Sequence, residues 1–237
     1  MDKQITAVVF SFFESITKDI VTRLFERGFA DKIIVVSKES TGDFKNITSL
    51  RSDYPFSADT ISKIIKLTKT PYILFINGKT KIEFFESTIS SFLSGLDETN
   101  ASWIYSDFNE KQVKDFIPHP LIDYQIGSIR DDFDFGNCFL VKADFIKDFL
   151  TDSTSIKNNF IYSGLYDLRL HISRKHPVIR ISKPLYSVAK LTEADSSGKM
   201  FEYVDPKNRE VQIEMEKVAT EHLKWINAFC YKSESQF

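Results

Sequence analysis

The first half of the chain alternates between short apolar runs and segments with helical spacing, and this alternation limits the possible folds more than any other feature. Four runs rich in Val, Ile and Phe have the continuous apolarity of strands buried on both faces: Ile5–Phe13, Lys32–Ser37, Tyr72–Ile76 and Trp103–Tyr105. Between them, apolar residues recur every three or four positions, which is typical of amphipathic helices. Repeated strand–helix–strand units favour right-handed crossovers and parallel pairing, so the sequence predicts a doubly wound α/β sheet.

The second half is less regular. Its predicted strands and helices are, in order, a strand at Phe135–Val141, a short helix at Ala143–Leu150, a helix at Tyr162–Arg174, and strands at Val178–Ile181 and Leu185–Val188. Three polar segments, 38–56, 111–120 and 153–159, are predicted as loops, and Asn77-Gly78 as a turn. Asp205-Pro206 is expected to open a long C-terminal helix with Met215, Val218, His222 and Trp225 on one stripe.

The chain shows no internal repeat and no low-complexity linker, which favours one domain. We expect that domain to span residues 1–230, with a nucleotide-binding half at 1–110, an acceptor or catalytic half at 111–230, and a polar tail at 231–237. Ser57 is expected to cap the helix that precedes Tyr72–Ile76.

Composition excludes several classes of protein. The formal net charge of −2 gives no support for binding to nucleic acid or for broad attraction to anionic membranes. Only 8 glycines are present and no glycine-rich phosphate motif occurs. The two cysteines, Cys138 and Cys230, form no CxxC pair, and the N-terminus has no signal-peptide pattern. The apolar runs are too short to span a bilayer, so we expect no integral membrane segment and a cytoplasmic location.

Polar residues at the ends of the predicted strands are the first candidates for a site, because open parallel sheets bind ligands at the carboxyl ends of their strands. The candidates at this edge are Ser11, Lys38, Asn77, Lys79 and Asp107. Lys79 could neutralise a phosphate, or it could be a surface lysine in a polar turn. Asp107 could act at the site, or it could cap the next turn.

A cluster of acids follows, and its role is open between two alternatives. In Arg130-Asp131-Asp132-Phe133-Asp134, Asp132 and Asp134 would project to one face of an extended segment and could bind a hard cation together with Asp107. The alternative is a solvated acidic loop. Gly136, just beyond the cluster, would allow a ligand to approach the backbone closely.

Two further candidates lie on predicted helices. Asp167 could serve as a catalytic base, or it could pair with Arg169 or Arg174. His222 lies on the apolar stripe of the last helix, where it could be a hydrogen-bonded core residue or could contact a ligand phosphate.

Several segments together resemble the GT-A-type family 2 glycosyltransferases. The matching segments are Ala7–Phe12, Lys32–Ser40, Pro71–Lys79, Phe135–Ala143, and Ser163–Leu170 followed by Val178–Val188. Tyr203–Phe229 suggests the N-terminal module of larger bacterial glycosyltransferases, with a second transferase domain following it. The resemblance implies a GT-A-like, Rossmann-like, mostly parallel mixed sheet flanked by helices, with a long C-terminal helix.

The same resemblance implies a function. It implies transfer of a hexose from a nucleotide-sugar donor to a glycan or lipid-linked acceptor, with Mg²⁺ or Mn²⁺ as cofactor, in polysaccharide biosynthesis. It also implies a protein that lies in the cytoplasm or peripherally at the inner face of the membrane.

The chain departs from the family at three motifs. Ser37-Lys38 stands where the family has a nucleotide-binding aspartate, Asn77-Gly78-Lys79 replaces the Asp-x-Asp motif, and Gly164-Leu165 stands near the expected Glu-Asp pair. If the chain is an enzyme, Asp107 and Asp167 are then the expected catalytic residues, assisted by Asp131–Asp134, and these acids should converge on one pocket. If they scatter, we expect a catalytically degenerate module that binds or acts as a scaffold beside an active transferase domain.

Overall fold

The computed structural model describes residues 4–39, 47–112, 115–189 and 209–230. The predicted tail at 231–237 and the predicted helix start at Asp205-Pro206 lie outside the described residues.

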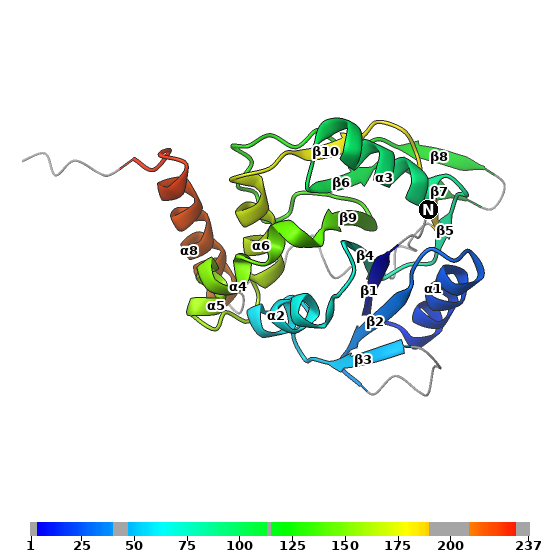
Figure 1. The fold of residues 1–237 in the computed structure, drawn as a ribbon, viewed down its shortest axis with the longest axis horizontal. Coiled ribbons are helices and arrows are strands. Elements are labelled where there is room, and N and C mark those ends of the chain that lie inside the picture. The colour runs from blue at the N-terminus through cyan, green and yellow to red at the C-terminus, as the bar shows by residue number, and fades with distance from the viewer. Residues whose placement is uncertain (1–3, 40–46, 113–114, 190–208, 231–237) are drawn as a thin grey trace, which may run out of the picture.

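A seven-stranded sheet forms the centre of the molecule, with strand order β10-β6-β9-β4-β1-β2-β3 (Figure 1). Its strands are β1 (Ile5–Ser11), β2 (Lys32–Ser37), β3 (Ile47–Arg51), β4 (Tyr72–Gly78), β6 (Trp103–Ser106), β9 (Cys138–Lys142) and β10 (Val178–Ile181). β1 pairs in parallel with β2 and β4, β2 with β3, and β6 with β10. β9 is antiparallel to both of its neighbours, β4 and β6. The sheet is therefore mixed but mostly parallel, as predicted.

Helices cover both faces of this sheet. α1 (Glu14–Glu26) and α3 (Thr88–Thr99) lie on one face, and α2 (Ala58–Leu67) and α6 (Gly164–Ser173) on the other (Figure 1). The chain enters α6 through a 3₁₀ turn (Ala143–Ile146) and two short helices, α4 (Phe149–Asp152) and α5 (Thr154–Lys157). Among the described residues, no helix is both long and apolar enough to cross a bilayer.

The long helix α8 (Arg209–Trp225) packs on α5 and α6 rather than on the sheet (Figure 1). Val218 from α8 joins a small apolar cluster with residues of α6, separate from the main core. Only part of the predicted stripe is buried, because Val218 and His222 are covered while Trp225 is 51% exposed.

A second, four-stranded sheet with order β5-β11-β7-β8 lies beside the carboxyl end of β6. It contains β5 (Ile82–Phe84), β7 (Phe108–Lys111), β8 (Phe116–His119) and β11 (Tyr186–Ala189). The predicted strand at Leu185–Val188 therefore exists, shifted by one residue, but it belongs to this second sheet.

Local signals at helix ends were informative. The Ser57 side chain accepts a hydrogen bond of 3.2 Å from the Thr60 amide, so the predicted N-cap of α2 is confirmed. Gly28 follows α1 with φ of +58°, a conformation that glycine adopts at little cost.

Several predicted loops contain regular structure instead. Segment 38–56 includes β3, segment 111–120 includes β8, and segment 153–159 includes α5. β3 and β8 are edge strands, so neither carries the continuous apolarity of a strand buried on both faces. Asn77-Gly78 is not a turn: both residues pair with the end of β1, as Phe10↔Asn77 and Ser11↔Gly78.

Candidate functional site

The carboxyl edge of β1, β2 and β4 is the first candidate site. The sheet brings Ser11, Asn77 and Lys79 together there, and Lys38 follows β2 on the same edge. A side chain at Gly78 would collide with the Phe10 carbonyl, so the close approach of β4 to β1 requires glycine.

Contacts among these residues are local. The Ser11 hydroxyl lies 2.7 Å from that of Thr17, and the Asn77 side-chain oxygen accepts a hydrogen bond of 3.3 Å from the Lys79 amide. The Lys79 ammonium lies 5.0 Å from the centre of the Phe12 ring. Phe12 is 38% exposed, and its neighbour Phe13 is 52% exposed. The edge thus offers an ammonium group and exposed rings, but no carboxylate at the three positions after β4.

Asp107 lies at the end of β6, where its carboxylate is held on both oxygens. Arg180 on β10 donates to it from Nε at 2.7 Å and from Nη2 at 2.9 Å, and the Leu121 amide donates at 2.9 Å. Burial raises the pKa of this carboxyl, but the Arg180 guanidinium and the Leu121 amide outweigh burial and hold the pKa below its ordinary value. The carboxylate joins β6, β10 and the segment after β8.

The acid cluster does not form a shared cation site. Asp132 forms a two-pronged pair with Arg130 at 2.9 and 2.8 Å, and this hydrogen-bonded pair lowers its pKa. Asp134 accepts a hydrogen bond of 2.7 Å from the Gly136 amide. Within the described part of the chain, no group of three His, Cys, Asp or Glu residues is placed to hold a metal ion. The cofactor Mg²⁺ or Mn²⁺ therefore stays a prediction.

Gly136 makes its close approach to Tyr186. It has φ of +72°, and an added Cβ would collide with the Tyr186 hydroxyl. That hydroxyl accepts a hydrogen bond of 2.7 Å from the Asn137 amide. The space beside Gly136 is thus occupied by a side chain of the second sheet.

Asp167 on α6 is fully buried and binds α5. Its Oδ2 accepts hydrogen bonds from the Ser153 hydroxyl at 2.6 Å and from the Ser155 amide at 2.8 Å. Among the described residues, Asp167 forms no ion pair with Arg169 or Arg174, and its Oδ1 has no hydrogen-bond partner. The carboxylate holds the N-terminal turn of α5 against α6.

His222 lies in the interface between α8 and α6, where its side chain is fully buried. Its Nδ1 accepts a hydrogen bond of 3.3 Å from Nε of Arg174. Burial and the charges of Arg174 and Arg169 lower the pKa of His222 to about 4, so the ring is neutral at pH 7. This geometry matches the alternative of a hydrogen-bonded core histidine.

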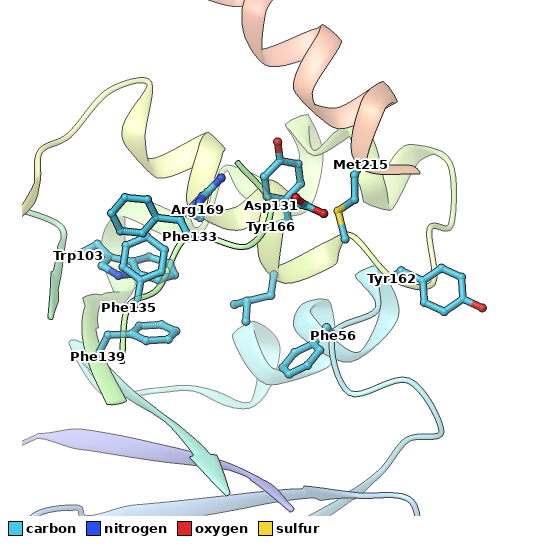
Figure 2. A pocket seen from close by; sticks show the side chains of 11 residues that line it. Phe56, Trp103, Asp131, Phe133, Phe135, Phe139, Tyr162, Tyr166, Arg169 and Met215 are labelled. Atoms are coloured by element: carbon cyan, nitrogen blue, oxygen red, sulfur yellow. The ribbon is translucent and has the colours of Figure 1, made fainter. Parts of the chain in front are cut away.

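A cavity of about 220 Å³ lies between the sheet, α6 and α8, and sequence reasoning missed it. Figure 2 shows its lining: Phe56, Trp103, Asp131, Phe133, Phe135, Phe139, Tyr162, Leu165, Tyr166, Arg169 and Met215. Trp103 stacks on Phe139 with ring centres 4.2 Å apart. The alternation Asp131-x-Phe133-x-Phe135, in a chain with 22 phenylalanines, was the available signal, but only the acids were considered.

Arg169 is the charged side chain buried at this cavity. It is 3% exposed, and its Nη2 donates a hydrogen bond of 2.7 Å to the Arg130 carbonyl. Its guanidinium carbon lies 4.8 Å from the ring centre of Tyr166 and 5.8 Å from that of Phe135. Burial lowers the pKa of Arg169.

Taken together, the predicted site residues fall into separate places. Ser11, Lys38, Asn77 and Lys79 share the sheet edge, and Asp131 lines the aromatic cavity. Asp107, Asp132, Asp134, Asp167 and His222 form their hydrogen bonds with different partners, although Asp134 also lies 3.9 Å from Nε2 of His119, whose charge acts on Asp107 as well.

Comparison of the sequence with protein-family models and with curated proteins gives no match. Among solved structures, residues 1–349 of S. aureus TarS align over 95% of this chain and 83% of that chain, with a TM-score of 0.54 and 10% identity. The same TarS fragment in complex with UDP-GlcNAc aligns with a TM-score of 0.55 and 14% identity, covering 95% of this chain and 73% of that one. In the longer TarS structure, the alignment spans 44% of that chain at 12% identity.

At this level of identity the likeness establishes the fold. The chain has the GT-A-like, Rossmann-type fold of TarS, and the predicted fold class is confirmed.

Proposed function

We propose that this chain is a GT-A-like module that binds a nucleotide sugar through its nucleotide diphosphate at the carboxyl edge of β1, β2 and β4, without assembling a sugar-transfer site from its own acids. The observation that carries this proposal is that Asp107, Asp132, Asp134 and Asp167 each already bind a neighbouring part of the fold. A general base must come within hydrogen-bond reach of its proton, and these carboxylates already accept hydrogen bonds from groups of the protein itself.

Two features support nucleotide binding at the edge. First, Lys38 and Lys79 place ammonium groups where a diphosphate would need cations, a role in which Lys acts as a point charge. Second, the similar structure of TarS has been solved with UDP-GlcNAc and with UDP. Exposed Phe12 and Phe13 beside Lys79 provide surfaces on which a planar base could stack.

The setting of this function is part of the proposal. We place the module in the cytoplasm, or at the inner face of the membrane, beside a C-terminal transferase domain in a longer chain. That domain would transfer the sugar to a glycan or lipid-linked acceptor, while this module binds the donor or holds the assembly together.

Isothermal titration tests the proposal. UDP, UDP-GlcNAc and a GDP-sugar are titrated with Mn²⁺ or with EDTA, and released nucleotide is assayed in parallel. We expect binding of at least one nucleotide, unchanged by EDTA, and no turnover. Lys79→Met should weaken that binding about three- to tenfold, because one charge-assisted contact is lost. Lys63→Met, which removes an exposed lysine of α2, is the matched control.

Two results would contradict the proposal. Donor turnover that Asp167→Asn abolishes without lowering the melting temperature would show that transfer resides in this chain. Absence of binding by all three nucleotides would remove the edge as a nucleotide site.

A further inference from the structure

The helix α8 covers one side of the aromatic cavity and forms its roof. Hydrogen bonds to one residue, Glu214, attach this roof to the segment before α6. Met215 of α8 lines the cavity, and its neighbour Glu214 accepts hydrogen bonds from the amides of Ile161 at 3.0 Å, Tyr162 at 2.8 Å and Ser163 at 3.2 Å. These amides precede α6, so the carboxylate lies at the positive end of that helix. The elements that border the cavity on this side therefore contact one another directly.

The size of the cavity limits its occupant to a small molecule. Its volume of about 220 Å³ exceeds the ~150 Å³ of an engineered protein cavity that binds benzene. One ring with a short substituent fits this volume. The lining contains none of Ser11, Lys38, Asn77 and Lys79, so the cavity is distinct from the nucleotide site proposed at the sheet edge.

The lining residues indicate what kind of ligand body, the part apart from any charged head group, the cavity would bind. Seven of the eleven lining residues are aromatic, and they come from the sheet, the segment before α2, the segment after β8, the segment before α6 and α6 itself. Such walls favour a flat apolar body, because offset and edge-to-face ring contacts stabilise it beyond the burial of its area.

Arg169 fixes the chemistry of the head group. The guanidinium is 3% exposed, and its Nε has no hydrogen-bond acceptor among the described residues. Burial lowers the pKa of Arg169, and Tyr124, Tyr166 and the charge of Asp131 oppose this effect, so one carboxylate already acts on the guanidinium. Aromatic rings attract the cation, but only an acceptor atom satisfies a buried N–H group. A carboxylate or phosphate oxygen supplies both the acceptor and the opposite charge.

Asp131 is the second charged residue of the lining, and it differs from Arg169 in its exposure. Its side chain is exposed to solvent while Arg169 is buried. Water and salt screen an exposed charge strongly and a buried charge weakly, so Arg169 dominates the potential inside the cavity. Asp131 is expected to weaken anion binding modestly.

We propose that the cavity beneath α6 and α8 binds a small anion with a flat apolar body, whose carboxylate or phosphate accepts a hydrogen bond from Arg169. This site is separate from the nucleotide site, and it gives the module a second ligand.

Tryptophan fluorescence tests this directly. The chain has two tryptophans, Trp103 in the cavity wall and Trp225 on α8, so Trp225→Phe leaves Trp103 as the reporter. Phenylacetate, phenyl phosphate and the neutral phenylacetamide are titrated into the full chain. We expect a saturable change with an anion and at least about tenfold weaker binding of the amide. Whichever anion binds more tightly identifies the head group as carboxylate or phosphate.

Variants separate the role of Arg169 from a general effect of charge. Arg169→Gln should abolish the preference for the anion over the amide, and Asp131→Asn should tighten anion binding about two- to threefold. Arg174→Gln, at the C-cap of the same helix and outside the cavity wall, is the matched control and should keep the preference. If Arg169→Gln does not fold, the proposal is tested by comparing the binding of phenylacetate and phenylacetamide to the chain with Arg169 in place.

Equal binding of phenylacetate and phenylacetamide, or no saturable response to either anion, would overturn the proposal. UDP should not displace phenylacetate. Anion binding without any UDP binding would contradict the nucleotide site alone, so failure of one proposal is distinguishable from failure of the other.

Discussion

At the carboxyl edge of β1, β2 and β4 the side chains are polar and partly exposed, whereas the cavity beneath α6 and α8 is walled by aromatic rings around a buried cation. The edge occupies the position where open α/β sheets bind ligands, but Asn77 and Lys79 stand where metal-binding acids were expected. No family motif found in the sequence corresponds to the cavity, but the residues that line it are more enclosed than those at the edge. The position of a site in a fold and the chemistry of its residues are therefore separate questions.

Two of the candidate catalytic acids are bound within the fold in a similar way. Asp107 at the end of β6 and Asp167 on α6 each bind a neighbouring element through two or more hydrogen bonds. Their contacts stabilise the fold, so stability measurements can separate structural acids from catalytic ones.

The largest expected effect concerns Asp107. Asp107→Ala leaves the Arg180 guanidinium, 14% exposed, without its two-pronged partner. Loss of one member of a buried pair costs roughly 3–5 kcal/mol, and we expect the free energy of unfolding to fall by about 3 kcal/mol in urea titrations. Asp123→Ala, which removes the exposed second partner of Arg180, should cost less than about 1 kcal/mol. Unchanged stability of Asp107→Ala with lost function would return Asp107 to a catalytic role.

The second effect depends on pH and probes the α6–α8 side. The pKa of His222 is lowered to about 4 in the folded state, while its ordinary value is 6.5. Between these values the unfolded chain binds more protons than the folded one, so stability present above pH 6.5 is lost as the pH falls toward 4. We expect His222 to account for a loss of about 2 kcal/mol between pH 7 and pH 4.

Chemical unfolding of the unsubstituted chain and of His222→Asn at pH 7, 5.5 and 4 measures this contribution. The variant should lose less stability over this interval. Parallel curves for the two proteins would show that His222 is not protonated on unfolding.

The smallest effect tests the roof of the cavity. Glu214→Gln removes a negative charge from the N-terminal end of α6 but keeps one hydrogen-bond acceptor. We expect the free energy of unfolding to fall by about 1 kcal/mol. Amide hydrogen exchange should become faster than in the unsubstituted chain, and the increase should be larger in α8 than in the sheet. Glu216→Gln, an exposed change on the same helix, is the control and should leave exchange unaltered. If Glu214→Gln leaves exchange in α8 unchanged, Glu214 does not anchor the roof.

Much of the fold was predictable from local patterns. The four apolar runs of the first half became β1, β2, β4 and β6, because a strand buried on both faces needs continuous apolarity and little else. The Ser57 cap followed from side-chain preferences that act within a few residues. Edge strands β3 and β8 escaped prediction because half-exposed strands carry no such pattern.

The candidate site was predictable in place but not in composition. The register of β1 and β4 did bring Ser11 and Asn77 to one edge, as expected for a parallel sheet. The partners of Asp107 and Asp167 were not predictable, since Arg180 lies 73 residues beyond Asp107 and binds it only when β10 pairs with β6.

The amino-acid sequence by itself determined the four buried strands of the first half, the parallel core and the lack of carboxylates at Asn77-Gly78-Lys79, because these depend on residue type and short-range spacing. Only the tertiary structure decided which carboxylates are already bound, which histidines are buried, and that seven aromatic residues and Arg169 line one cavity. Those facts depend on contacts between residues far apart along the chain. Such contacts arise from the packing of α6 and α8 against the sheet, which no local pattern encodes.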